Sequence, residues 1–153
     1  MKSNLKRFEA ERSFLKDHAR QQVDFAQTPQ NRHVAPPPLQ KPCPPEVRRI
    51  KIPDGAEAMA RLGCMTVGEA IRRRESVRDY TASPLTLKEL SALLWATQGV
   101  REVISNTCAL RTVPSAGARH SFETYLAVMR VESLEPGLYR YCAGRPDRMT
   151  YFA

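Results

Sequence analysis

The sequence predicts an α+β fold with a mixed or antiparallel sheet and flanking helices. Two segments that begin with a helix-capping pattern are followed by three short apolar segments, which turn residues separate. Helices that precede a run of neighbouring strands are typical of the α+β class. With 153 residues the chain can form one domain with its own core, which we expect to occupy residues 66–153.

Residues 1–65 are predicted to be an N-terminal extension. The spacing of apolar residues predicts a short amphipathic helix over residues 5–20. Most of the 12 prolines lie between Gln27 and Pro53, and proline removes a backbone donor and disfavours helix in the residue before it. This proline-rich arm is expected to run extended without regular structure, as a tether, a docking peptide or an arm over a partner subunit.

Two capping boxes predict the helices of the domain. Thr66 and Glu69 open the first helix, expected over residues 66–74, because each side chain can bond the backbone N–H at the other position. Thr86 and Glu89 open a second helix, which Gly99 is placed to end. The apolar stripe expected on this second helix consists of Leu87, Leu90, Leu93 and Leu94.

Three strands are expected after these helices. Residues 101–113 are predicted to be a loop, and Tyr125–Val131 a buried strand. Leu138–Cys142 alternates like a strand with one solvated face, and Met149–Ala153 begins a third strand in which the chain ends. Such a sheet keeps one face and at least one edge uncovered, so we expect either a partner chain that supplies the missing layer or a truncated gene product.

Charge and cysteine content restrict the functional classes. The net charge is +8 and most basic residues are arginine, which suits a phosphate or carboxylate ligand but is also common on a solvated basic surface. No cysteine pair has zinc-binding spacing, and no segment resembles a signal peptide or a membrane span. We therefore expect a cytoplasmic protein with free thiols, in which Cys142 is a small strand residue rather than a nucleophile.

Two short strings could bind an anionic, flat ligand. Arg74 and Arg78 with Ser76 between them can converge on one phosphate, although a string of this kind also occurs in kinase substrates and on charged surfaces. Pro114–Gly117 is a small-residue turn whose backbone can approach a flat ligand closely, although an ordinary tight turn would have the same composition.

In this order and spacing, the strings resemble the N-terminal half of the nitroreductase family and its α/β sandwich. Five linked features carry the resemblance: Arg74-Glu-Ser-Val-Arg78, P-L-T-L-x-E-L, L-L-W-A-x-Q-G, P-S-A-G-A and P-G-L-Y-x-Y. The similarity runs from Thr66 to Ala153 and is greatest to the branch of dehydrogenases that oxidise azolines to azoles in modified peptides. The proline-rich arm is also similar to leaders that precede this branch.

The resemblance implies an FMN-dependent oxidoreductase whose flavin lies between two subunits, as in a homodimer. Hydride would pass through flavin N5 between NAD(P)H or an organic donor and a small-molecule or peptide substrate, so neither a catalytic side chain nor a metal is expected. His120 is a candidate for substrate contact, although a single histidine at this place is more often structural. The resemblance places Arg74, Ser76 and Arg78 at the FMN phosphate and ribityl chain, and Pro114, Ser115, Ala116 and Gly117 along the isoalloxazine ring.

Two departures from the family pattern keep other functions open. Glu75 stands where many relatives have a second arginine, and the C-terminal half of the family domain is absent from this sequence. One alternative is therefore a catalytically inactive, truncated remnant. Another is a non-enzymatic module that binds through the proline-rich arm and the basic residues, although no nucleic-acid or membrane-binding motif accompanies them.

Overall fold

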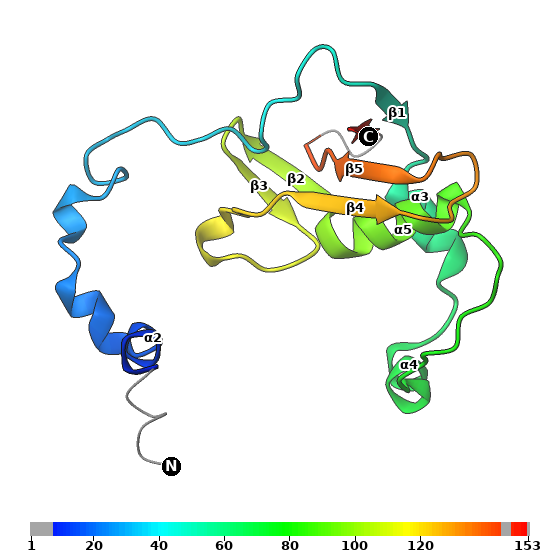
Figure 1. Cartoon of the computed structure of the whole chain (residues 1–153), viewed down its shortest axis with the longest axis horizontal. Helices are drawn as coiled ribbons and strands as arrows, with labels where there is room; N and C mark the ends of the chain where they lie inside the picture. Colours follow the sequence, from blue (N-terminus) through cyan, green and yellow to red (C-terminus); the bar gives the residue numbers. More distant parts are fainter. Residues whose placement is uncertain (1–7, 145–147, 153) are drawn as a thin grey trace. The chain divides into compact units, whose positions relative to one another are not determined.

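The computed structural model describes residues 8–144 and 148–152, and it divides the chain into two compact units. The first unit comprises Met1–Pro36 and the second Pro37–Ala153. Figure 1 shows both units and labels most of their helices and strands. The second unit contains the sheet and both strings predicted to bind a ligand.

The described residues of the first unit form short helical turns. Helix α2 spans Glu9–Phe14 and is followed by the 3-10 helices η1 (Asp17–Gln22) and η2 (Phe25–Gln27). The prediction of one helix over residues 5–20 is wrong in its described part, because Lys16 is extended, with φ −94° and ψ 145°, and separates α2 from η1. No residue of α2 is buried, so no core specifies a longer helix here.

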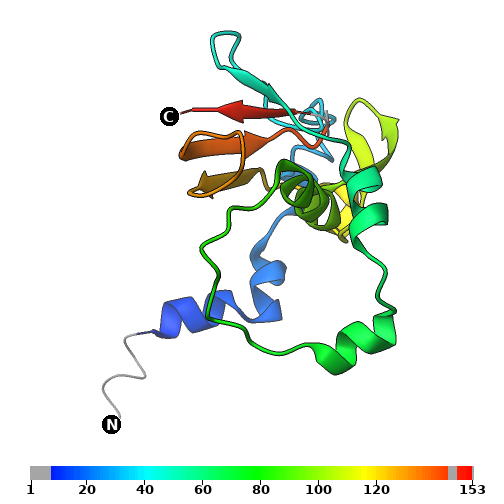
Figure 2. The same ribbon diagram turned by 90° about the vertical axis from the view of Figure 1, so that its right-hand side faces the viewer.

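The second unit is built on a four-stranded antiparallel sheet with strand order β1-β6-β5-β4 (Figures 1 and 2). Its strands are β1 (Arg49–Lys51), β4 (Thr124–Val128), β5 (Gly137–Tyr141) and β6 (Arg148–Tyr151). The expected α+β class with an antiparallel sheet is therefore confirmed. The prediction that the arm has no regular structure is wrong at β1, which pairs with β6 and covers one of its edges.

The burial of β4 and β5 is the reverse of the prediction. β4 is not fully buried, since its residues alternate and Tyr125 is 49% exposed. β5 has no solvated face over its second half, because Tyr139, Arg140 and Tyr141 are all buried. The cause lies in the arm: the backbone carbonyl of Pro42 accepts a hydrogen bond of 3.2 Å from Arg140 Nη2, so the arm covers the side of β5 that was expected to meet water.

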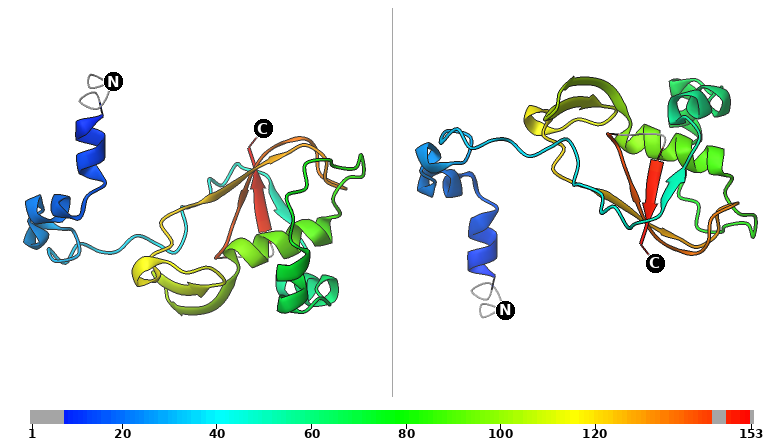
Figure 3. Two further views of the ribbon diagram at one scale, coloured as in Figure 1. Left: turned by 90° about the horizontal axis from the view of Figure 1, so that it is seen from below. Right: turned by 90° about the horizontal axis from the view of Figure 1, so that it is seen from above.

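Helices α3 (Gly55–Leu62) and α5 (Leu87–Gln98) lie beside one face of this sheet (Figures 2 and 3). Helix α3 was not predicted and begins at Asp54, whose side chain accepts a hydrogen bond of 2.9 Å from Glu57 N. Among the helices of residues 8–144, none is long and apolar enough to cross a lipid bilayer. The core between helices and sheet contains Ile52, Leu90, Leu94, Val128, Tyr139, Tyr141, Ala143 and Met149.

The predicted helices of the domain are both present. Helix α4 spans Val67–Arg73 and is capped by the Thr66 side chain, which accepts a hydrogen bond from Glu69 N. The second bond of the predicted capping box is not formed; the Glu69 carboxylate instead lies 3.4 Å from Arg73 Nη1. Helix α5 has the complete box. Its apolar stripe is correct at the buried Leu90 and Leu94 and wrong at Leu93, which is 54% exposed.

We expect Thr86→Ala to lower the free energy of unfolding by about 1 kcal/mol, because the first turn of α5 loses its side-chain acceptor. The Thr86 hydroxyl accepts a hydrogen bond of 3.2 Å from Glu89 N, and α5 packs against the core. The measurement is equilibrium unfolding in urea. The matched control is Thr66→Ala, which removes the same cap from α4, a helix without buried residues, and should leave the midpoint nearly unchanged. Equal losses of unfolding free energy in the two variants would mean that packing of α5 on the core does not determine the effect of its cap.

A β-hairpin replaces the loop predicted for residues 101–113. Its strands β2 (Val100–Ser105) and β3 (Cys108–Arg111) are antiparallel and form a separate two-stranded sheet. The Ser105 hydroxyl accepts a hydrogen bond from Thr107 N at 3.2 Å and supports the turn between the strands. The hairpin carries the chain from the end of α5 to the Pro114–Gly117 string.

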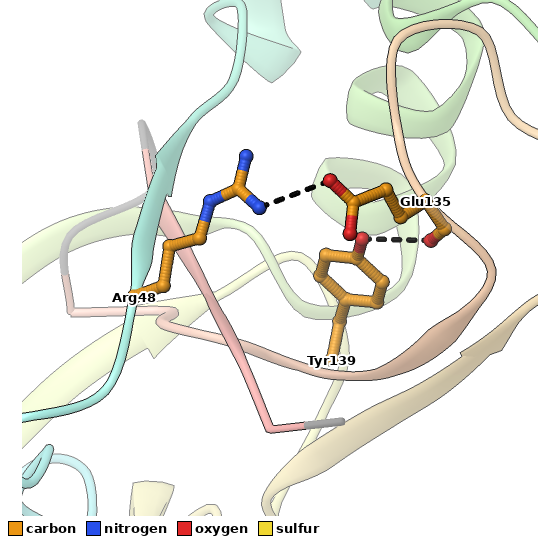
Figure 4. A network of polar contacts seen from close by, with 3 residues as sticks. All are labelled: Arg48, Glu135 and Tyr139. Atoms are coloured by element: carbon orange, nitrogen blue, oxygen red, sulfur yellow. Dashed lines mark hydrogen bonds and ion pairs between the residues drawn. The ribbon is translucent and has the colours of Figure 1, made fainter.

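A small polar network joins β1 to the turn between β4 and β5 (Figure 4). Arg48 Nη1 lies 3.2 Å from Glu135 Oε1, and the Tyr139 hydroxyl donates a hydrogen bond of 2.8 Å to the Glu135 carbonyl. Both members of the ion pair are more than half exposed, so its contribution to stability is small.

Candidate functional site

The Arg74–Arg78 string lies in an exposed, extended segment. Helix α4 ends at Arg73, and the next residue, Arg74, is extended with φ −61° and ψ 118°. Arg74, Ser76 and Arg78 are all exposed, so their donors are accessible to a ligand. Because this segment follows the C-terminus of a helix, the helix dipole does not attract an anion here, and the guanidinium groups would have to provide the attraction themselves.

The Pro114–Gly117 string forms a tightly folded turn. Ser115 precedes the 3-10 helix η3 (Ala116–Ala118), and its hydroxyl accepts a hydrogen bond of 2.9 Å from His120 N. Gly117 has φ +60°, a conformation that glycine adopts at little cost. Ala118 and His120 also have positive φ, of 52° and 44°, which strains a residue with a side chain.

The end of α5 holds this turn in place. The Thr112 hydroxyl donates a hydrogen bond of 2.9 Å to the Trp95 carbonyl, and Thr112 N donates one of 2.9 Å to the Gly99 carbonyl. A Cβ atom on Gly99 would lie 2.5 Å from the Trp95 carbonyl oxygen, so only glycine allows this close approach. The predicted end of the helix at Gly99 is thus confirmed, and its packing explains the residue.

A pocket of about 390 Å³ opens beside the turn. It combines apolar surfaces with hydroxyl, amide, guanidinium and imidazole groups, the mixture found in small-molecule sites. His120 is one of its lining residues; burial lowers the pKa of this imidazole, and the charge of Arg111 lowers it further, so the neutral form is favoured at pH 7. The other lining residues used below are Gln98, Pro114, Ser115 and Ala116.

Arg111 is a buried cation beside this pocket that the sequence did not suggest. Its Nη1 donates a hydrogen bond of 3.2 Å to Gln98 Oε1, and its Nη2 donates one of 3.3 Å to the Leu39 carbonyl. Within the described residues its Nε has no hydrogen-bond partner. Burial lowers the pKa of Arg111, and the carboxylate of Glu123 opposes this shift. Only the register of β3 identifies this arginine, since nothing distinguishes it in the sequence.

The structure does not bring the two predicted strings together within one chain. None of Arg74, Ser76 and Arg78 lines the pocket beside Pro114–Gly117. Figures 1 and 3 show α4 and the turn after β3 well apart. The described residues contain no group of three or more His, Cys, Asp or Glu side chains that could hold a metal ion.

The cysteines are all free thiols. Cys142 is buried directly after β5, and burial raises its pKa, so the unreactive thiol form is favoured at neutral pH. Cys142 was predicted to be a small strand residue rather than a nucleophile; it lies one residue beyond the strand, and its burial is consistent with a packing role.

Comparison with known proteins gives two matches. The sequence profile described as "Nitroreductase family" matches residues 71–147, a range that includes Arg74–Arg78 and Pro114–Gly117. The chain is also 37% identical over 100 residues to "Putative nitroreductase MJ1384" from Methanocaldococcus jannaschii. That alignment covers 65% of this chain and 45% of the relative, so the chain spans about half of the relative's length.

Proposed function

The chain belongs to the nitroreductase family, and from this premise we propose that it is an FMN-dependent oxidoreductase related to the azoline dehydrogenase branch. Bound FMN would accept and donate hydride at N5. The electron donor is NAD(P)H or an organic compound, and the substrate is a small molecule or a peptide. The observation that carries the proposal is that the matched range contains both strings suited to a flavin nucleotide.

The residues present fit the phosphate end of FMN. Two guanidinium groups and one hydroxyl, from Arg74, Arg78 and Ser76, are exposed within one short segment. Such a set provides charge-assisted donors for a phosphate dianion. The proposal therefore assigns these three residues to binding the phosphate and orienting the ribityl chain.

The pocket beside Pro114–Gly117 fits the flat end of the cofactor. Pro114 and Ala116 supply an apolar surface, while Ser115 contributes a polar group at the same turn. The buried charge of Arg111 gives the turn a positive potential, which favours electron density on a ring stacked against it. His120, held neutral, is available to donate or accept a hydrogen bond at a substrate.

Because the two strings lie apart in one chain, the proposed cofactor contacts two chains. The second chain is either another copy, in a homodimer, or a partner that completes the fold. The proposal expects flavin binding to depend on association, so that the molar mass and the flavin content of purified protein change together.

The test is the visible absorbance of the protein after incubation with FMN and desalting. We expect flavin close to one per chain, and roughly tenfold weaker FMN binding in Arg74→Gln and in Arg78→Gln, because each removes a charge-assisted contact. Arg72→Gln is the matched control, since it removes a neighbouring exposed charge outside the assigned set. A colourless wild-type protein, or an equal loss of FMN affinity in all three variants, would contradict the proposal.

A further inference from the structure

The face of the sheet turned away from α3 and α5 carries a row of basic residues. Side chains alternate between the faces of a strand, and Met149 and Tyr141 point to the core. Their neighbours Thr150 and Arg140 therefore lie on the opposite face, which we call the outer face. There Arg49 pairs with Thr150, and Thr150 pairs with Arg140, in one row across three strands.

A second row beside it adds more positive charge. Lys51 pairs with Arg148 on the same face, directly next to the first row. Like charges on neighbouring positions of a sheet repel one another and lower stability. An anion bound between these cations would relieve the repulsion.

The proline-rich arm contacts the outer face beside these basic residues. Gln40 Oε1 accepts a hydrogen bond of 2.7 Å from Gly144 N, and the Pro42 carbonyl accepts one from Arg140 Nη2. Arg140 is 2% exposed, and its Nε has no hydrogen-bond partner among the described residues. The arm and the outer face thus both line one partly open pocket.

This outer-face pocket has a volume of about 290 Å³. No aspartate or glutamate is among its described lining residues, whereas two arginines, one threonine and one glutamine provide hydrogen-bond donors. The Thr150 hydroxyl donates a long bond of 3.4 Å to the Arg140 carbonyl and also interacts with the Cys142 thiol. The lining residues are Gln40, Cys43, Arg49, Cys142, Arg148 and Thr150.

We propose that the outer-face pocket is a second anion site, which binds a phosphate group between Arg49 and Arg148. Two guanidinium groups with a hydroxyl between them match the oxygens of a phosphate. The pocket lies on the sheet and the arm and shares no residue with the Arg74–Arg78 string or with the turn at Pro114–Gly117. It is therefore distinct from the proposed FMN site.

Cys43 provides a reporter inside the pocket, because it is half-buried there. Iodoacetate and iodoacetamide both alkylate a thiolate with loss of iodide, but only iodoacetate is an anion. The ratio of their rates therefore reports the local potential, and the exposed Cys64 supplies the reference ratio in the same protein. We expect the ratio at Cys43 to exceed that at Cys64 by roughly fivefold, as one neighbouring unit charge would produce.

Peptide mass spectrometry of the full chain measures these ratios. Inorganic phosphate should lower the Cys43 ratio to that of Cys64, and Arg49→Gln should do the same without phosphate. Arg48→Gln is the matched control, since that neighbouring guanidinium pairs with Glu135, and it should leave the ratio unchanged. In the double variant R74Q/R78Q, phosphate should still protect Cys43. Equal ratios at Cys43 and Cys64, or protection that is lost in R74Q/R78Q, would overturn the second site.

Discussion

Leu94→Ala is expected to lower the free energy of unfolding by about 2–5 kcal/mol, the largest effect of any single change considered for this protein. Leu94 is 3% exposed and lies in the core between α5 and the sheet. Truncation removes buried apolar surface and leaves a cavity that the surrounding side chains fill only partly. The measurement is equilibrium unfolding in urea, with the slope compared between variants to confirm a two-state transition.

The preceding residue is the natural control. Leu93 is 54% exposed on the same turn of the same helix, so Leu93→Ala changes helix propensity and composition in the same way but creates no cavity. Leu93→Ala should lower the free energy of unfolding by less than about 1 kcal/mol. Comparable losses for the two leucines would mean that α5 presents a different face to the sheet.

Gly55→Ala is expected to destabilise the protein by about 1–3 kcal/mol through overpacking between α3 and α5. A Cβ atom at this position would lie 2.5 Å from Trp95 Cβ and 2.7 Å from the Ser91 carbonyl oxygen. The Ser91 hydroxyl also donates a hydrogen bond of 2.7 Å to the Pro53 carbonyl, so the start of α3 cannot simply move away. Thermal unfolding monitored by circular dichroism measures the loss.

Gly68→Ala provides a control of opposite sign. Apart from its chain neighbours and the backbone of its own helix, no atom lies within 4 Å of a Cβ built on Gly68, which lies in the exposed helix α4. Alanine there favours helix over the unfolded chain, and a gain of up to about 1 kcal/mol in local helix stability is expected. A loss for Gly68→Ala as large as that for Gly55→Ala would show that steric contact with α5 is not the cause.

The elements that the sequence predicted correctly are those specified by local interactions. The capping box of Thr86 and Glu89 needs only four consecutive residues, and its hydrogen bonds lower the pKa of the Glu89 carboxyl. The strand predicted over Leu138–Cys142 likewise matches β5 within one residue at each end. The predicted apolar stripe on α5 was wrong at Leu93. Four leucines cover more than one face of the helix, and tertiary packing decides which of them are buried.

The missed elements depend on contacts between distant parts of the chain or on patterns that proline obscured. β1 has three residues, and its strand conformation depends on pairing with β6, which lies far away in the sequence. The hairpin of β2 and β3 has irregular register, which weakens the alternation of apolar residues. Helix α3 had a readable signal, since Asp54 and Glu57 form an N-terminal cap pattern, but the prolines before it suggested that the extension continued.

The predicted binding residues are a different case, because their roles stay predictions. The sequence identified both strings, and the structure adds the pocket beside one of them and the exposure of the other. It also adds Arg111 and Arg140, two buried arginines that no local pattern distinguishes from the many exposed ones. Burial of a cation depends on which strand faces which surface, so sequence alone could not select them.

The pairing of β1 with β6 also determines when the sheet can be completed. Arg49 pairs with Thr150, although most of the second unit separates them in the chain, and such long-range contacts slow folding. At a synthesis rate of roughly 5–20 residues per second, the nascent β1 segment waits for seconds before its partner is made. Its short length and its two charges, Arg49 and Lys51, reduce the chance that it pairs with another nascent chain in that interval.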